Sequence, residues 1–180
     1  IRRDLDKLDR QGLAIKSYGG AVLNENSTLD MPFNVSKNRN IKGKQQIADL
    51  ISGFVQEDEH IIVDPSTTAV AIVKALKNRK KLTVITSSIE VLIELSDVSG
   101  WDIICTGGTL RENYLTLVGS RAADMICSFY ADKAIISCKG IDMNKGVTDA
   151  NEALSQVKQA MLRSAKQRIV AADHTKFGNV

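Results

Sequence analysis

The sequence predicts an α/β protein with a mostly parallel sheet between two layers of helices, and three observations support this fold class. From Asp58 onward, short apolar runs alternate with segments of helical periodicity. The runs are β-branched and apolar without alternation, as expected of strands that are covered on both faces. This repeated order of strand and helix gives parallel strands joined by right-handed crossovers. The expected strands are residues 60–64, 82–86, 102–106, 133–138 and 168–172.

Amphipathic helices are expected between these strands. Apolar residues recur at i, i+3, i+4 and i+7 in residues 69–76 and 122–129, and the same theme continues in residues 154–161. An earlier apolar stripe in residues 47–54 predicts a further helix of the same layers. The helical segments therefore complete the alternation that a three-layer fold requires.

Length and composition fit one sizeable core with a small additional element. The chain has 180 residues, of which 43% are hydrophobic and 25% charged, as is ordinary for a globular protein. No apolar run approaches the roughly 18 residues that cross a bilayer, and no secretory leader pattern opens the chain, so we expect a cytoplasmic protein. The three cysteines show no CxxC spacing and there are two histidines, so we expect no disulfide framework, metal site or cofactor.

The first residues predict a separate element. The segment "IRRDLDKLDRQG" combines an apolar stripe with arginines that project elsewhere, and Gly12 is expected to end the helix. The segment "LAIKSYGGAVL" then predicts a β-hairpin. A basic helix followed by a hairpin is how a winged helix-turn-helix ends, although a solvated amphipathic helix has the same pattern. Because the sequence opens inside this pattern, we expect either a piece of a longer chain or a chain whose disordered ends are left out.

We predict three regions along the chain. Residues 1–23 form a small element of a helix and a hairpin, and residues 24–40, which are polar and without periodicity, form a linker. Residues 41–180 form the α/β domain.

The residues that directly follow the strands are rich in hydroxyls, glycines and lysines. In an open parallel sheet, ligands bind outside the carboxyl ends of the strands. Hydroxyls beside the unpaired N–H groups of a helix start suit an anion such as phosphate, although the same residues are also preferred as plain helix caps. We therefore predict a small-molecule site at this edge. Its segments are "DPSTT" (64–68), "TSS" (86–88), "TGG" (106–108), "CKG" (138–140) and "ADHTK" (172–176).

An enzyme is the alternative interpretation of this edge. An isomerase of sugar phosphates needs a carboxylate base beside the substrate, and Asp64, Asp142, Asp149 and Glu152 are candidates by type. No spacing groups them into a catalytic constellation, and the sequence has no GxSxG, paired-histidine or Walker-type motif. We therefore expect a binding protein without catalytic residues.

The run "IRRDLDKLDRQGLAIKSYGGAV" resembles the end of the winged helix-turn-helix of the DeoR family of bacterial transcriptional regulators. Further segments resemble that family's effector domain in the same order, among them "RNIKGKQQIA", "IIVDPSTT", "CTGGTLRENYLTLVG", "ADKAIISCKGID" and "ADHTKFG". The resemblance covers nearly the whole chain. It implies a DNA-binding head, of which residues 1–23 are the C-terminal part of the winged helix-turn-helix, joined to an effector-binding domain over residues 41–180. That domain is implied to be a three-layer α/β/α fold with a Rossmann-like sheet, similar to ribose-5-phosphate isomerase, that senses phosphorylated sugars.

The resemblance also implies two sets of binding residues. The DNA-binding set is Arg2, Arg3, Lys7, Lys16 and Tyr18. The effector-binding set is Asp64, Ser66, Thr67, Thr68, Thr86, Ser87, Ser88, Gly107, Gly108, Gly119, Lys139 and Lys158, with Asp173 and Lys176 in a segment near it. Three positions depart from the family pattern, because Ser66 stands where glycine is usual, Ser87 where asparagine is common, and Tyr18 where the wing usually has histidine.

These features together predict a transcriptional regulator. We expect a repressor of a carbohydrate operon that binds operator DNA, responds to a phosphorylated sugar or sugar alcohol, and assembles as a homo-oligomer because paired heads read paired half-sites. An isomerase-like enzyme of the same fold is one alternative. A sugar-phosphate-binding domain whose main role is assembly is another.

Overall fold

The computed structural model describes residues 2–10, 14–23, 32–149 and 151–179. These residues divide into two compact units, residues 1–32 and residues 33–180. Among the described residues, no helix is long and apolar enough to cross a membrane.

The first unit consists of a helix and a two-stranded hairpin. Helix α1 (Arg2–Arg10) is followed by β1 (Ala14–Ser17), which pairs antiparallel with β2 (Gly20–Leu23). Ser17 lies opposite Gly20, so Tyr18 and Gly19 form the turn, and Gly19 has the positive φ of 92° that such a tight turn favours in glycine. The helix and the hairpin follow the order that the sequence predicts, while the helix end expected at Gly12 lies outside the described residues.

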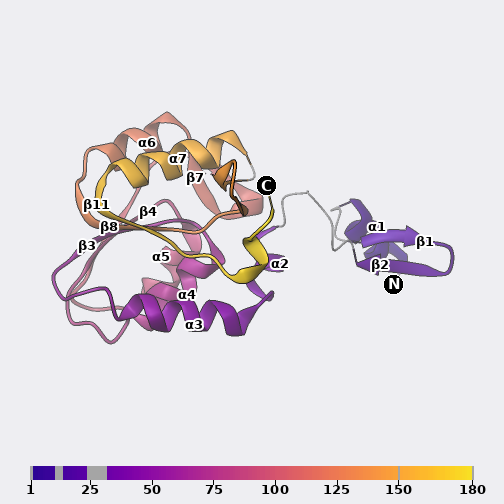
Figure 1. Cartoon of the computed structure of the whole chain (residues 1–180), viewed down its shortest axis with the longest axis horizontal. Coiled ribbons are helices and arrows are strands. Elements are labelled where there is room, and N and C mark those ends of the chain that lie inside the picture. Colours follow the sequence, from indigo (N-terminus) through magenta and orange to yellow (C-terminus); the bar gives the residue numbers. More distant parts are fainter. Residues whose placement is uncertain (1, 11–13, 24–31, 150, 180) are drawn as a thin grey trace. The chain divides into compact units, whose positions relative to one another are not determined.

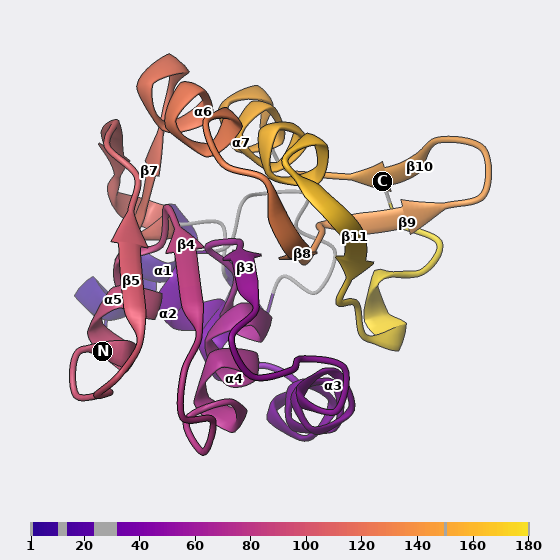
Figure 2. The same cartoon turned by 90° about the vertical axis from the view of Figure 1, so that its left-hand side faces the viewer.

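The second unit contains a five-stranded parallel sheet in the order β11-β8-β3-β4-β5 (Figure 2). Its strands are β3 (His60–Val63), β4 (Thr83–Thr86), β5 (Asp102–Cys105), β8 (Ala131–Ile136) and β11 (Ala165–Val170). All of the predicted strands are present, and β8 and β11 begin earlier than predicted. The chain builds β3, β4 and β5 outward in one direction and then returns to place β8 on the other side of β3. The carboxyl ends of β3 and β8 therefore flank the point where such sheets leave a ligand-binding crevice.

Helices cover both faces of the sheet (Figure 1). Helices α3 (Ile41–Ser52), α4 (Thr67–Ala75) and α5 (Ile89–Leu95) lie on one face, and α6 (Ser120–Cys127) and α7 (Glu152–Arg163) lie on the other. The predicted three-layer α/β/α architecture is confirmed.

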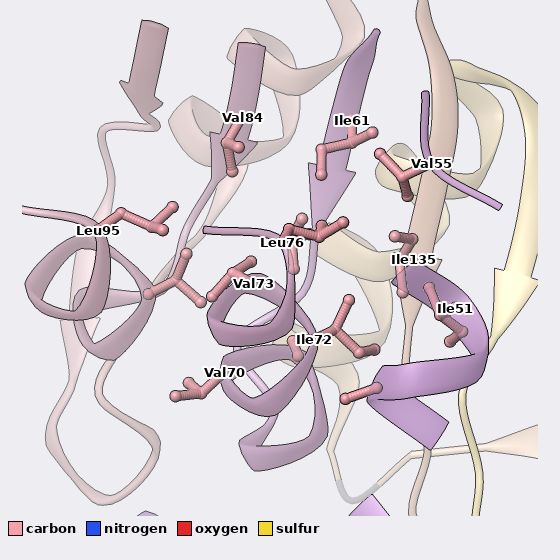
Figure 3. Close-up of a cluster of buried hydrophobic side chains, with 14 of the residues drawn as sticks. Ile51, Val55, Ile61, Val70, Ile72, Val73, Leu76, Val84, Leu95 and Ile135 are labelled. Atoms are coloured by element: carbon pink, nitrogen blue, oxygen red, sulfur yellow. The ribbon is translucent and has the colours of Figure 1, made fainter. Parts of the chain in front are cut away.

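A separate apolar core fills each side of the sheet. Ile61 points into the core shared with α3 and α4, which Figure 3 shows, whereas its neighbour Ile62 points into the core shared with α6 and α7. Successive strand residues face opposite sides, which explains why these strands are apolar without alternation. Both side chains are fully buried.

A short helix lies within the predicted linker of residues 24–40. Helix α2 (Phe33–Lys37) belongs to the second unit, and Phe33 is buried in the core that α3 and α4 share. The structure thus extends the α/β domain back to residue 33, because one aromatic side chain in a polar stretch is enough to anchor a turn of helix. Residues 24–31 lie outside the described residues.

Several short elements lie at the carboxyl edge of the sheet. The hairpin of β6 (Thr109–Arg111) and β7 (Thr116–Val118) carries the 3₁₀ turn η1 (Glu112–Tyr114) between its strands. The hairpin of β9 (Gly140–Asp142) and β10 (Gly146–Thr148) follows β8, and the 3₁₀ turn η2 (His174–Lys176) follows β11. Three-residue strands are too short for a periodic pattern, so the sequence did not predict the two hairpins.

Candidate functional site

A buried ion-pair network lies at the carboxyl ends of β3 and β8. Asp64, at the end of β3, is fully buried, and its Oδ2 lies 3.1 Å from Nζ of Lys158 on α7. Lys158 also forms an ion pair with Asp149, which follows β10, and donates a hydrogen bond of 2.8 Å to the carbonyl oxygen of Ser137. The carboxylate of Asp64 also accepts hydrogen bonds from the backbone N–H groups of Ser66 and Ser137. The network therefore connects the ends of β3 and β8 with α7.

The protonation of Lys158 is fixed by its two partners. Burial by itself would lower the pKa of Lys158, but the nearby carboxylates of Asp64 and Asp149 outweigh it and raise that pKa above the ordinary lysine value. Lys158 therefore stays charged, and its charge is already matched by two carboxylates. Asp64 and Lys158 lie at the carboxyl edge of the sheet and contact each other, so the Lys158 charge is already taken up, and its network with Asp64 and Asp149 carries a net negative charge.

Of the hydroxyls of "DPSTT", that of Ser66 caps helix α4, whereas those of Thr67 and Thr68 do not cap it. Ser66 is the N-cap of α4, because its side chain accepts a hydrogen bond of 3.0 Å from the N–H of Ala69. The N–H groups of Thr67 and Thr68 have no hydrogen-bond partner among the described residues, and neither does the Thr68 hydroxyl. Thr67 makes one long contact, 3.4 Å from its Oγ1 to Oγ of Ser36 on α2. The start of α4 thus offers two N–H groups and the half-buried Thr67 hydroxyl to an anion, whereas the Thr68 side chain is buried.

The hydroxyls of "TSS" are all engaged inside the protein. Thr86 donates to the carbonyl oxygen of Val63 and accepts from the N–H of Ser88. Ser87 lies 3.1 Å from the Thr116 hydroxyl, and Ser88 is the N-cap of α5. All three serine and threonine side chains of this segment are fully buried. Their structural role is to fix β7 and α5 at the edge of the sheet.

The three glycines at this edge differ in whether a side chain would fit there. Gly108 has a φ of 133°, and a Cβ there would lie 2.6 Å from the carbonyl oxygen of Val118, so no other residue fits. Gly119 also has a positive φ, of 98°, but its Cβ direction is open, as is that of Gly107. These two positions therefore let a ligand approach the backbone closely.

Lys44 belongs to this edge, although the sequence analysis did not select it. It lies on α3, is 7% exposed, and donates a hydrogen bond to the carbonyl oxygen of Ser36, the residue whose hydroxyl contacts Thr67. Burial lowers the pKa of Lys44, and the nearby cations Lys176 and Arg39 lower it further, while Asp173 opposes them. Cations thus outnumber carboxylates around the Lys44 amine. An anion at the start of α4 would satisfy this excess of positive charge.

Lys139 of the predicted effector set and further polar residues that follow the strands lie around the same edge. Lys139 is half-buried after β8, and its N–H donates to the carbonyl oxygen of Thr148. Thr106, after β5, is buried, and its hydroxyl has no hydrogen-bond partner among the described residues. Asp173 caps η2 by accepting from the N–H of Thr175, which orients Lys176 in the following turn. The edge therefore combines polar groups from several loops, as the sequence predicts.

The carboxylates considered for catalysis do not form a catalytic group. Asp64 is bound to Lys158, Asp142 accepts two backbone N–H groups in the β9–β10 turn, and Glu152 accepts from Gln156 on the surface of α7. No group of three His, Cys, Asp or Glu that could hold a metal ion occurs within the described part of the chain.

The predicted DNA-binding residues lie in the first unit. Arg2, Arg3 and Lys7 are on α1, and Lys16 and Tyr18 are on the hairpin and its turn. The side chains of Arg3 and Tyr18 are exposed. Those of Arg2, Lys7 and Lys16 lie outside the described side chains.

Comparison with known proteins defines the class to which these two units belong. Residues 39–180 match the DeoR C terminal sensor domain, and residues 1–27 match the DeoR-like helix-turn-helix domain. A sensor domain of this size preceded by a helix-turn-helix match defines a DNA-binding regulator. The chain belongs to the DeoR family of transcriptional regulators.

Named relatives agree with this assignment. The HTH-type transcriptional regulator YulB of Bacillus subtilis is 36% identical over 99% of this chain and 69% of its own length. The HTH-type transcriptional repressor GlcR of the same organism is also 36% identical, over 99% of this chain and 68% of its own length. The glycerol-3-phosphate regulon repressor of Escherichia coli is 29% identical over 99% of this chain and 70% of its own length. These relatives confirm the prediction of a regulator rather than an enzyme.

Solved structures confirm the fold. Ribose 5-phosphate isomerase A from Methanocaldococcus jannaschii superposes with a TM-score of 0.57 at 13% identity, over 77% of this chain and 55% of the isomerase. The ribose 5-phosphate isomerase from Plasmodium falciparum superposes with a TM-score of 0.55 at 14% identity, over 77% of this chain and 53% of the isomerase. The chain thus spans little more than half the length of these enzymes, and at this identity the likeness concerns the fold alone.

Proposed function

We propose that this protein represses a carbohydrate operon and that its affinity for DNA changes when a phosphorylated sugar or sugar alcohol binds at the carboxyl edge of the sheet. The observation that carries the proposal is the start of α4. There, the N–H groups of Thr67 and Thr68 lack partners among the described residues, and the buried cation Lys44 is linked to Thr67 through Ser36. Helix N-termini with a neighbouring lysine are suited to phosphate.

The dianionic charge of a phosphate distinguishes this ligand from its unphosphorylated parent. Burial is the largest cause of the lowered pKa of Lys44, and Asp173 offsets the repulsion from Lys176 and Arg39, so a dianion beside the amine would favour its charged form in addition to making new hydrogen bonds. The name of the glycerol-3-phosphate regulon repressor is in keeping with a phosphorylated effector.

The DNA contacts are proposed for the first unit. Arg3 on α1 and Tyr18 at the hairpin turn are exposed, as residues that reach phosphates or base edges must be. A homo-oligomer is proposed because two heads are needed to read two half-sites. Sedimentation of the protein as a monomer at micromolar concentration would contradict that assembly.

The experiment that tests the function measures DNA binding with and without effector. Fluorescence anisotropy with the full-length protein would compare labelled DNA from the region upstream of the protein's own gene with a scrambled duplex, at several salt concentrations. We expect a preference for the upstream DNA that changes on addition of one phosphorylated sugar and not of its parent sugar. No preference over scrambled DNA would refute the repressor, and a preference that no phosphorylated sugar alters would refute the effector.

A further inference from the structure

A groove of about 810 Å³ lies beside the edge already described and has no role in the proposed phosphate contacts. One wall is formed by residues 110–114 of the β6–β7 hairpin, and the other by residues of the first turns of α7. This volume is in the range of pockets that hold small-molecule ligands. The groove is therefore large enough for a sugar.

The lining of the groove is polar and of mixed charge. Arg111 and Asn113 reach it from one wall, and neither side chain has a hydrogen bond or ion pair with another described residue. Glu152 and Gln156 reach it from the other wall, where Nε2 of Gln156 donates 3.0 Å to Oε1 of Glu152 and fixes both side chains. The ring of Tyr114 adds an apolar surface.

This chemistry favours a neutral polyhydroxylated group over a phosphate. Each sugar hydroxyl donates one hydrogen bond and accepts others, so it needs donors such as Arg111 and Asn113 together with acceptors such as Glu152. Glu112 and Glu152 line the groove together with one cation, Arg111, so the lining has a net negative charge that would repel a dianion. The groove and the start of α4 are therefore suited to different parts of a ligand.

Both walls of the groove are attached to the edge that holds the proposed phosphate site. The β6–β7 wall is held there by β7, because the N–H of Leu117 donates 2.9 Å to the carbonyl oxygen of Ser87. The α7 wall is held there by Lys158, which is paired with Asp64 two residues before the cap of α4. Both walls of the groove are thus tied to residues at the edge of the sheet from which α4 starts.

We propose that the groove is the specificity subsite of the effector site and binds the neutral, hydroxyl-bearing part of the phosphorylated effector. Asn113 and Gln156 are the amide side chains that read its hydroxyls. This inference rests on the proposed function, since it needs a phosphorylated effector anchored at the start of α4.

The test compares two glutamines of α7. Gln156 lines the groove, whereas Gln159 is exposed on the same helix and does not line the groove. Isothermal titration would measure the affinities of the wild type, Gln156→Ala, Asn113→Ala and Gln159→Ala for a panel of phosphorylated sugars and sugar alcohols that differ at single hydroxyls. Removing one neutral hydrogen bond is expected to weaken the preferred ligand about five- to tenfold and to reduce discrimination between epimers. Gln159→Ala should leave the affinity for the preferred ligand and the discrimination between epimers unchanged.

Two negative outcomes are distinguishable. Phosphorylated sugars that bind the wild type with an affinity order that neither Gln156→Ala nor Asn113→Ala alters would overturn the specificity subsite and leave the phosphate site standing. A wild type that binds no member of the panel would overturn the proposed effector and the subsite together. Equal loss of affinity in Gln156→Ala and Gln159→Ala would also contradict the subsite, because it would indicate a general effect on α7.

Discussion

The ammonium group of Lys158 lies 3.1 Å from Oδ2 of Asp64, a fully buried carboxylate 94 positions earlier in the chain. The same ammonium pairs with Asp149, so a single cation holds α7 and the segment after β10 to the end of β3. A buried charge of this kind is costly to leave unpaired. Lys158 therefore holds these three segments together beside the proposed effector site.

Replacing Lys158 by methionine should strongly destabilise the protein. The change removes the cation and leaves Asp64 and Asp149 facing each other in a buried place, and breaking such a pair typically costs about 3–5 kcal/mol. Urea unfolding would measure the difference. Lys80→Met, at an exposed lysine, is the control and should change the free energy of unfolding by less than about 0.5 kcal/mol. Equal effects of the two substitutions would show that the buried pair is not stabilising.

The same pair predicts a dependence of stability on alkaline pH. The pKa of Lys158 is raised in the folded protein by its carboxylate partners, although burial opposes this. Its contribution is therefore fully present below the unfolded lysine pKa of about 10.4 and is lost as the pH rises through the higher folded value. The difference in unfolding free energy between wild type and Lys158→Met should shrink above about pH 10.4. A difference that stays constant through this range would contradict the raised pKa.

Neighbouring glycines at the edge should respond differently to alanine. Gly108→Ala puts a Cβ 2.6 Å from the carbonyl oxygen of Val118 at a φ of 133°, so we expect a loss of about 1–3 kcal/mol in unfolding free energy. Gly107→Ala meets no atom within 4 Å and should be nearly neutral. Thermal and urea unfolding would compare the two. A Gly108→Ala protein as stable as the wild type would show that the turn can be rebuilt.

Adjacent hydroxyls at the start of α4 should separate capping from binding. Ser66→Ala removes the N-cap and should cost about 1 kcal/mol of stability, as measured by urea unfolding. Thr67→Ala removes only a long contact of 3.4 Å and should cost less stability, while it weakens phosphorylated ligands in calorimetry. If Thr67→Ala bound every ligand as the wild type does, its hydroxyl would have no part in the site.

The sheet was predictable because its signal is local. Buried parallel strands need consecutive β-branched residues, and helices need apolar residues at fixed spacing, so both patterns appear within single segments. Helix α2 and the short hairpins carry too few residues for either pattern. Phe33 shows this, because its burial depends on a core formed by segments far away in the sequence.

The meeting of the polar loops at one edge of the sheet was predictable, but the local role of each residue in them was less so. Loops after parallel strands meet at one edge whatever their sequence, which is why "DPSTT" and "TSS" lie there. Capping and ligand binding use the same hydroxyls, so only the structure shows that Ser66 and Ser88 are caps. Lys158 and Lys44 both look like solvated helix charges in the sequence, because the groups that surround them come from other elements.

The central claim is that a phosphorylated sugar binds beside Lys44 at the start of α4, and calorimetry with a matched lysine pair tests it most directly. Lys44 is buried, whereas Lys42 on the same helix is exposed. A charge-assisted hydrogen bond of about 1.5–3 kcal/mol predicts that Lys44→Met binds the effector roughly 10- to 100-fold more weakly, while Lys42→Met binds it as the wild type does. The unfolding free energy of Lys44→Met should not fall, because a buried cation is removed. Unchanged affinity in Lys44→Met, or equal binding of the unphosphorylated parent sugar, would contradict the account.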